Sequence, residues 1–259
     1  MIGKKLRIHD IMDANDRALI VELDAGLYGL NLSNIKDTLE KLPLELIDAI
    51  ILSPGKATKL CDFFTRKLGP SLIVRCDWTN AHWDDKFILA KERVRHIITC
   101  PADSGSRIGA SALVGSLFVG GEHDEDDCIN LNNLCIVVRS CIDFGLPFLV
   151  ECLPQGPRIT IDNFADAAEM AARVMIEIGA DMVAAPSLGS EKKWADFVGC
   201  CEDKPLFYVE KRQSGVDFQV LDRELEFHLK GSGNGLIING FIPNLHKNIQ
   251  LLAKKIHKK

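Results

Sequence analysis

Five charged side chains lie at or just after the ends of short apolar runs, where a side chain can take part in chemistry. They are Asp24, Lys56, Glu151, Glu210 and Lys211. Paired carboxylates such as Asp24 and Glu151 can act as general acid and base. A lysine amine can instead attack a carbonyl carbon, provided that desolvation or a second cation lowers its pKa. The sequence therefore offers proton transfer between carboxylates, or Schiff-base chemistry on one of two lysines.

The histidines and cysteines do not form a recognisable metal motif. The seven histidines show no HxxxH or HExxH spacing, and the nine cysteines contain no CxxC. Cys200 and Cys201 are adjacent. The acidic run Asp124–Asp127 after His123 is typical of a helix start, where carboxylates are favoured. We expect no metal site, no cofactor and reduced, buried thiols in a cytoplasmic protein.

Eight short apolar runs recur along the chain, each bounded by turn residues. They cover residues 18–24, 47–52, 71–76, 112–118, 147–152, 181–185, 205–210 and 235–239. Runs of this length, rich in β-branched and large apolar side chains, are typical of strands buried on both faces of a parallel sheet.

Helical periodicity separates these runs. The spacing predicts helices over residues 164–178, 128–144 and 244–255. Eight strand–helix units suit a single (β/α)₈ TIM barrel, an α/β fold of one domain over residues 1–259. The alternative is an open doubly wound sheet, but the turn after the first run, Asp24 to Gly29, does not match GxGxxG.

The segment from Asp77 to Gly109 departs from this regular alternation. We expect a loop at the mouth of the barrel followed by a helix, with a strand over 95–99 as the alternative. In such a barrel the working side chains sit at the carboxyl ends of the strands and in the loops that follow. The five charged residues named above satisfy that condition.

Bulk composition describes an ordinary acidic protein. Hydrophobic residues make up 47% of the chain and the formal net charge is −5. No basic stripe suggests nucleic-acid binding. No apolar stretch reaches the roughly 18 residues of a membrane span, and no signal peptide is visible at the N-terminus.

The order and spacing of several short segments carry a family resemblance across residues 18–255. These are Leu23-Asp24-Ala25-Gly26, Ser53-Pro54-Gly55, Gly145-Leu146-Pro147-Phe148-Leu149, Pro154-Gln155-Gly156-Pro157 and Ile178-Gly179-Ala180-Asp181-Met182-Val183. The chain resembles the class I aldolase superfamily, in particular archaeal-type fructose-bisphosphate aldolases, aminodideoxyheptulosonate synthases and deoxyribose-phosphate aldolases. The resemblance implies a homo-oligomer and a small carbonyl or sugar-phosphate substrate.

The same resemblance places the family's reactive residues at positions that differ here. The Schiff-base lysine at the end of the sixth strand corresponds to Ala184, and the proton-transferring tyrosine to Leu153. The phosphate-binding turns correspond to residues 210–215 and 239–241, which lack the family's Gly-Gly and Gly-Arg. Asp24 is retained. Alanine has no lone pair with which to attack a carbonyl, so the family's usual mechanism does not carry over.

Three functional hypotheses follow. The first is a carbon–carbon lyase whose Schiff base forms on another lysine, with Lys211 preferred because the end of strand seven overlooks the Ala184 position. The second is a catalytically degenerate aldolase homologue that serves as a binding or regulatory protein. The third is an isomerase that uses Asp24 and Glu151 as acid and base. Strand alternation adds a constraint, because Glu210 and Lys211 cannot both face inward along a regular strand.

Overall fold

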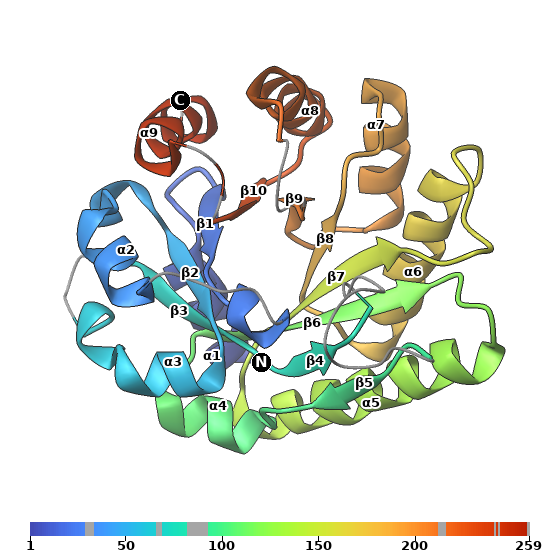
Figure 1. The fold of residues 1–259 in the computed structure, drawn as a ribbon, viewed down its shortest axis with the longest axis horizontal. Coiled ribbons are helices and arrows are strands. Elements are labelled where there is room, and N and C mark those ends of the chain that lie inside the picture. The colour runs from blue at the N-terminus through green and yellow to red at the C-terminus, as the bar shows by residue number, and fades with distance from the viewer. Residues whose placement is uncertain are drawn as a thin grey trace.

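Eight parallel strands close into a barrel with helices outside it (Figure 1). The computed structural model describes residues 1–28, 34–65, 69–81, 93–211, 216–240, 242 and 244–257. The barrel strands are β1 (Ala18–Glu22), β2 (Ala49–Leu52), β3 (Ser71–Arg75), β6 (Ala112–Val119), β7 (Phe148–Pro154), β8 (Met182–Ala185), β9 (Leu206–Glu210) and β10 (Gly235–Asn239). Each lies in or overlaps one predicted apolar run. The predicted (β/α)₈ TIM barrel is therefore confirmed, and the open sheet is excluded because β1 pairs with β10.

Helices follow most strands and cover the outside of the barrel. They are α1 (Ile2–Ile11), α2 (Ile35–Lys41), α3 (Pro54–Lys59), α4 (Ala102–Ile108), α5 (Asp124–Phe144), α6 (Phe164–Ile178), α7 (Glu191–Cys200), α8 (Phe218–Lys230) and α9 (Leu245–Ile256). The predicted helix over 164–178 matches α6, and α5 starts four residues before its predicted start, at the acidic turn that favours a helix N-terminus. None of the described helices is long and apolar enough to cross a membrane.

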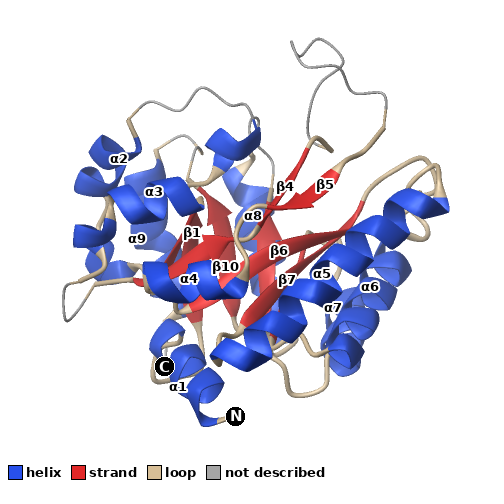
Figure 2. Ribbon diagram, turned by 90° about the horizontal axis from the view of Figure 1, so that it is seen from below, coloured by secondary structure: helices blue, strands red, loops and turns tan. Residues whose placement is uncertain are grey.

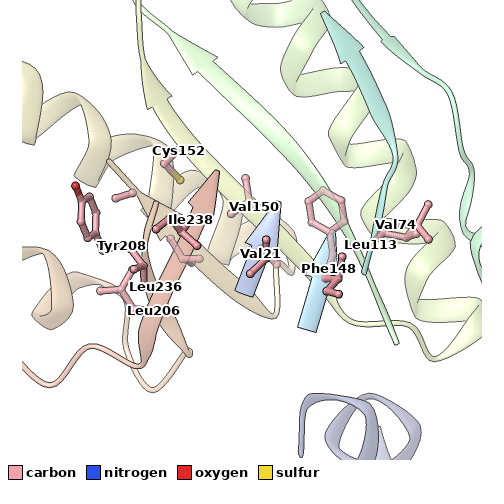
Figure 3. Packing of buried hydrophobic residues seen from close by; sticks show 14 of the residues in the cluster. Val21, Val74, Leu113, Phe148, Val150, Cys152, Leu206, Tyr208, Leu236 and Ile238 are labelled. Atoms are coloured by element: carbon pink, nitrogen blue, oxygen red, sulfur yellow. The ribbon is translucent and has the colours of Figure 1, made fainter. Parts of the chain in front are cut away.

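Side chains alternate between the barrel lumen and the helices, so both faces of every strand are buried. The outward face carries Val21, Val74 and Tyr208, among others, and packs against the surrounding helices (Figure 3). The lumen contains a separate apolar cluster that includes Ile20 and Ala184. Helix α1 adds its C-terminal end to this lumen cluster and lies at the end of the barrel opposite the hairpin of β4 (Asp77–Thr79) and β5 (His96–Ile98) (Figure 2).

A small antiparallel hairpin interrupts the alternation after β3. Strand β4 (Asp77–Thr79) pairs with β5 (His96–Ile98), and α4 follows. The strand that we kept as the alternative for residues 95–99 is thus present, and its β-branched Ile97 and Ile98 suit a strand. The loop predicted from Asp77 onward is replaced at its start by β4, and the part of it over residues 82–92 lies outside the described residues.

Gly235 closes the barrel where β10 meets β1. Its φ is +145°, and a Cβ added there would lie 1.9 Å from the carbonyl oxygen of Ala18. Gly235→Ala should therefore lower the free energy of unfolding by at least about 2 kcal/mol, since backbone atoms cannot move aside cheaply. Denaturant unfolding measures this loss. Gly55→Ala in α3 is the matched control, because nothing lies within 4 Å of its added Cβ. An equal loss in both variants would contradict the argument.

Candidate functional site

Arg75 is the centre of a buried group of charged residues in the barrel lumen. Its side chain is completely buried, and it projects inward from the last position of β3. Nε donates to Asp24 Oδ2 at 2.6 Å. Nη2 donates to Glu22 Oε1 at 2.6 Å and Glu151 Oε1 at 3.1 Å, while Nη1 donates to Glu151 Oε2 at 2.8 Å and Ser116 Oγ at 3.2 Å. These bonds match the five N–H groups of a guanidinium, so four strands are tied together at one level of the lumen.

Lys211 joins this group from the residue after β9. Its Nζ lies 2.6 Å from Glu22 Oε1 and 2.8 Å from Glu151 Oε1, and 19% of its side chain remains exposed. Glu151 lies on β7, and β8 is the strand between β7 and β9. The residue of β8 in register with Glu151 is Ala184, which also faces the lumen. Its small methyl group leaves space in the lumen for the side chain of Lys211.

The two glutamates that hold Lys211 have opposite pKa shifts. Burial raises the pKa of Glu22 to about 7, although Lys211 opposes the shift. Burial also acts to raise the pKa of Glu151, but the charges and hydrogen bonds of Arg75 and Lys211 outweigh it and hold this pKa well below its usual range. Glu151 binds Arg75 through both oxygens and Lys211 through Oε1, whereas Glu22 binds the two cations through Oε1 alone, which explains the difference. Glu22 is therefore poised to gain or lose a proton near neutral pH.

The pKa of Lys211 is raised. Burial acts to lower it, but the negative charges of Glu151 and Glu22 outweigh burial. Lys211 is thus an ammonium group in the resting protein. The lowered pKa that would activate a nucleophilic lysine is not supplied by this arrangement, and a reaction on Lys211 requires a proton acceptor close to Nζ.

A second polar chain leads from the lumen to the hairpin. Asp77 Oδ1 lies 3.8 Å from Arg75 Nη1, and Asp77 Oδ2 accepts from the backbone N–H of Ser116 at 2.6 Å. His96 Nε2 lies 2.9 Å from the same Oδ2, and His96 Nδ1 lies 3.3 Å from the side-chain nitrogen of Asn133. Both contacts are satisfied if Nε2 carries the proton and Nδ1 accepts. His96 is therefore an orienting partner of Asp77.

The five residues expected from the sequence divide into two groups. Asp24, Glu151 and Lys211 meet around Arg75, as described above. Glu210 is buried on the outward face of β9, where its carboxylate accepts a hydrogen bond from Tyr208 Oη at 2.9 Å. Lys56 is exposed on the short helix α3. The alternation along β9 thus directs Lys211 inward and Glu210 away from the lumen. Neither Glu210 nor Lys56 belongs to the charged group around Arg75.

Glu22 and Arg75 belong to the site but were not among the residues selected from the sequence. Each is the charged last residue of a mostly apolar strand. A charge in such a run must find partners across the barrel, because an unpaired buried charge is costly. For Glu22 the sequence carried a signal in its spacing from Asp24. Glu22 lies two residues before Asp24 and therefore shares its face of the strand.

A cavity of about 470 Å³ lies beside the charged group, and Lys211 is not among the residues that line it. Its walls include Val94 and Ile97 of the hairpin region, Phe118 of β6 and Gln155 after β7. His96 lines it as well, so the cavity and the charged group share the His96–Asp77 contact. None of the five residues expected from the sequence lines this cavity. Within the described parts of the chain, no three metal-ligating side chains are grouped so that they could hold an ion.

Stability should depend on pH through Glu22. The folded protein retains this proton up to about pH 7, whereas a glutamate carboxyl in the unfolded chain releases it near pH 4.5. The stabilisation is complete below pH 4.5 and is lost as pH rises through 7, on the order of 3 kcal/mol in total. In denaturant unfolding, the free energy of unfolding of the parent should therefore fall as pH rises from 4.5 through 7. Glu22→Gln should show no such fall. Parallel curves for the two proteins would contradict the shift.

Comparison with known proteins supports the same fold and family. The model of the DeoC/LacD family of aldolases matches residues 10–193. An uncharacterised aldolase of Saccharolobus solfataricus is 30% identical over 206 residues, which are 76% of this chain and 73% of that protein. A 2-amino-3,7-dideoxy-D-threo-hept-6-ulosonate synthase of Archaeoglobus fulgidus is 24% identical over 234 residues, 90% of this chain and 82% of that one.

A solved structure shares the whole fold. It is an archaeal fructose-1,6-bisphosphate aldolase with its catalytic lysine covalently bound to the carbinolamine intermediate, and it superposes with a TM-score of 0.81 over 98% of this chain and 100% of that one. At 17% sequence identity this likeness concerns the fold alone. The family model covers most of the chain and the Saccharolobus relative agrees with it. The chain belongs to the DeoC/LacD family of aldolases.

Proposed function

We propose that this barrel is a carbon–carbon lyase that forms its Schiff base on Lys211. The observation that carries the proposal is the position of Lys211 Nζ, which lies between Glu22 and Glu151 in the lumen. A lysine that follows β9 would thereby bring its amine towards β8, the strand on which the resembling aldolases carry theirs. The remaining exposed part of Lys211 gives a substrate carbonyl a route to it.

The reaction requires Lys211 to lose a proton before it attacks. Glu22 is the proposed acceptor, because its carboxylate oxygen already lies 2.6 Å from Nζ and its pKa of about 7 permits it to hold a proton at neutral pH. The neutral amine then adds to the carbonyl carbon of the substrate, and loss of water from the carbinolamine gives the iminium ion. As the substrate hydroxyl gives up its proton, the electrons of the breaking carbon–carbon bond move into this iminium, which releases one carbonyl product and leaves an enamine on Lys211. A proton added to the enamine carbon restores an iminium, and water then hydrolyses it and frees Lys211.

Two other carboxylates, those of Glu151 and Asp24, would assist this cycle. Glu151 keeps its negative charge beside the positive iminium. Hydrogen bonds from Arg75 hold Glu151 and Glu22 in position. Asp24 binds Arg75 through Oδ2, whereas its buried Oδ1 has no hydrogen-bond partner among the described residues and could accept a hydrogen bond from a substrate hydroxyl. The proposed substrate is a small carbonyl compound or sugar phosphate.

One observation favours a second candidate, a binding or regulatory barrel without catalysis. Both ion pairs of Lys211 raise its pKa, and a lysine in that state can be a structural cation that neutralises two buried glutamates. Borohydride reduction in the presence of a panel of aldehydes, ketones and sugar phosphates, followed by intact-mass measurement, separates the two candidates. The lyase gives a covalent adduct with at least one carbonyl compound, and the binding protein gives none.

Two further proposals concern assembly and cellular location. A homo-oligomer is proposed from the family resemblance, and a mass of 28.7 kDa by sedimentation at micromolar concentration would count against it. A cytoplasmic location is proposed because the nine cysteines are all free, as expected for a reducing compartment. Fractionation of the source cells with an antibody to the protein tests that location.

A further inference from the structure

Two adjacent thiols lie at the carboxyl end of α7, on the opposite side of β7 and β9 from the lumen. Cys200 is the last residue of the helix and is partly exposed, whereas Cys201 follows as the C-cap and is 1% exposed. The connection from Cys201 leads directly into β9, the strand that ends before Lys211. A chemical change at this pair would therefore occur close to a strand that positions the charged group.

The sulfur atoms of the pair already touch. Cys200 Sγ and Cys201 Sγ are 4.0 Å apart, and Cys200 Sγ lies 3.0 Å from the carbonyl oxygen of Phe197. Since that carbonyl can only accept, the Cys200 thiol donates to it while it is protonated, and Cys201 then donates to Cys200. Once Cys200 ionises, its thiolate can still accept from Cys201.

This arrangement makes the two thiols chemically different. The hydrogen bond from Cys201 lowers the pKa of Cys200, burial opposes that effect, and Arg173 of α6 assists it. Cys201 shows the opposite behaviour, because its hydrogen bond to Cys200 and its burial raise its pKa. Cys200, the partly exposed member of the pair, is thus the one that forms a thiolate. The thiolate is the nucleophile in thiol oxidation.

We propose that Cys200 and Cys201 form a dithiol modification site that hydroperoxides convert reversibly to a vicinal disulfide. The Cys200 thiolate attacks one peroxide oxygen, the O–O bond breaks, and Cys200 becomes a sulfenic acid while hydroxide, or alkoxide from an organic peroxide, leaves. The Cys201 sulfur then attacks the sulfenic sulfur, its proton and the sulfenic hydroxyl leave together as water, and the S–S bond forms. Two thiols are oxidised and one peroxide is reduced.

The position of the pair favours a bond that is easily reversed. Adjacent Cα atoms are about 3.8 Å apart across a trans peptide, which is shorter than the usual span of a disulfide, and such bonds are more readily reduced. The backbone at the pair can also adjust, because α7 ends there and Glu202 already adopts a left-handed turn with φ of 53°.

Peptide mass spectrometry tests the proposal on the folded full-length chain. After hydrogen peroxide treatment and alkylation of the remaining thiols, trypsin should release a peptide of residues 194–211, because the bond between Lys204 and Pro205 resists cleavage. This peptide contains Cys200 and Cys201 and no other cysteine. We expect this peptide to lack two hydrogen atoms and to carry no alkyl group. Dithiothreitol should restore the two thiols, and a second round of alkylation should then modify both. Cys61 and Cys128 are exposed thiols in other segments and report the extent of oxidation.

Two variants identify the attacking sulfur. In Cys201→Ser, Cys200 should stop at sulfenic acid, which dimedone traps. In Cys200→Ser, Cys201 should be oxidised at least 10-fold more slowly, and circular dichroism checks that both variants are folded. If Cys200 and Cys201 of the parent protein are still fully alkylated when Cys61 is already oxidised, the proposal is overturned. A disulfide from either cysteine to Cys152, or equally fast oxidation of Cys201 in Cys200→Ser, would also overturn it.

Discussion

Replacing Lys211 with methionine should abolish borohydride trapping, with a loss of at least about 100-fold relative to the parent. Methionine keeps the length and apolar body of the side chain but has no amine to attack a carbonyl. The result should hold for every carbonyl compound that traps the parent, because the proposed nucleophile is the same for each. Intact-mass measurement after reduction provides the readout, and peptide mapping of the parent adduct locates the modified residue.

Lys56→Met is the matched control, because Lys56 is an exposed lysine on α3 with no part in the charged group. Its trapping should equal that of the parent. Glu22→Gln tests the proton acceptor separately: the adduct should still form on Lys211, but more slowly, and its rate should no longer rise as pH passes 7. An adduct that persists in Lys211→Met would exclude this lysine, and a parent that traps nothing would favour the non-catalytic barrel.

The barrel could be predicted from the sequence because its strands are buried on both faces. Runs such as the one that became β10, Gly235–Asn239, are continuous apolar segments bounded by turn residues, and their number sets the architecture. The hairpin was harder to predict, since β4 and β5 have three residues each and pair with one another outside the barrel. Short strands carry little periodicity.

The site could be predicted in part, by the rule that working residues follow the strands. That rule selected Lys211 and Glu151, but it also selected Glu210, because position along the chain does not say which face a residue occupies. The inward face of β9 is fixed only when Phe207 and Val209 are seen in the lumen cluster. Arg75 was missed for a related reason, since its partners come from strands that are distant in sequence.

Arg75 should be the most costly single side chain to remove from the charged group. Arg75→Met fills a similar volume but leaves Glu22, Asp24 and Glu151 in the lumen with Lys211 as their remaining cation among the described contacts. Breaking a buried ion pair in this way costs about 3–5 kcal/mol. At neutral pH the variant should lose at least that much free energy of unfolding, or fail to fold, and denaturant unfolding monitored by circular dichroism measures the loss.

The pH dependence of that loss distinguishes charge from packing. Without Arg75 the buried carboxylates should hold protons to higher pH, so Arg75→Met should recover stability relative to the parent as pH falls from 8 towards 5, whereas a packing defect would not respond to protons. Arg93→Met is the matched control: Arg93 also pairs with carboxylates, Glu125 and Asp126, but 34% of its side chain is exposed. Water screens such a pair, so its removal should cost far less. Equal losses in the two variants, at every pH, would mean that Arg75 does not hold the charged group together.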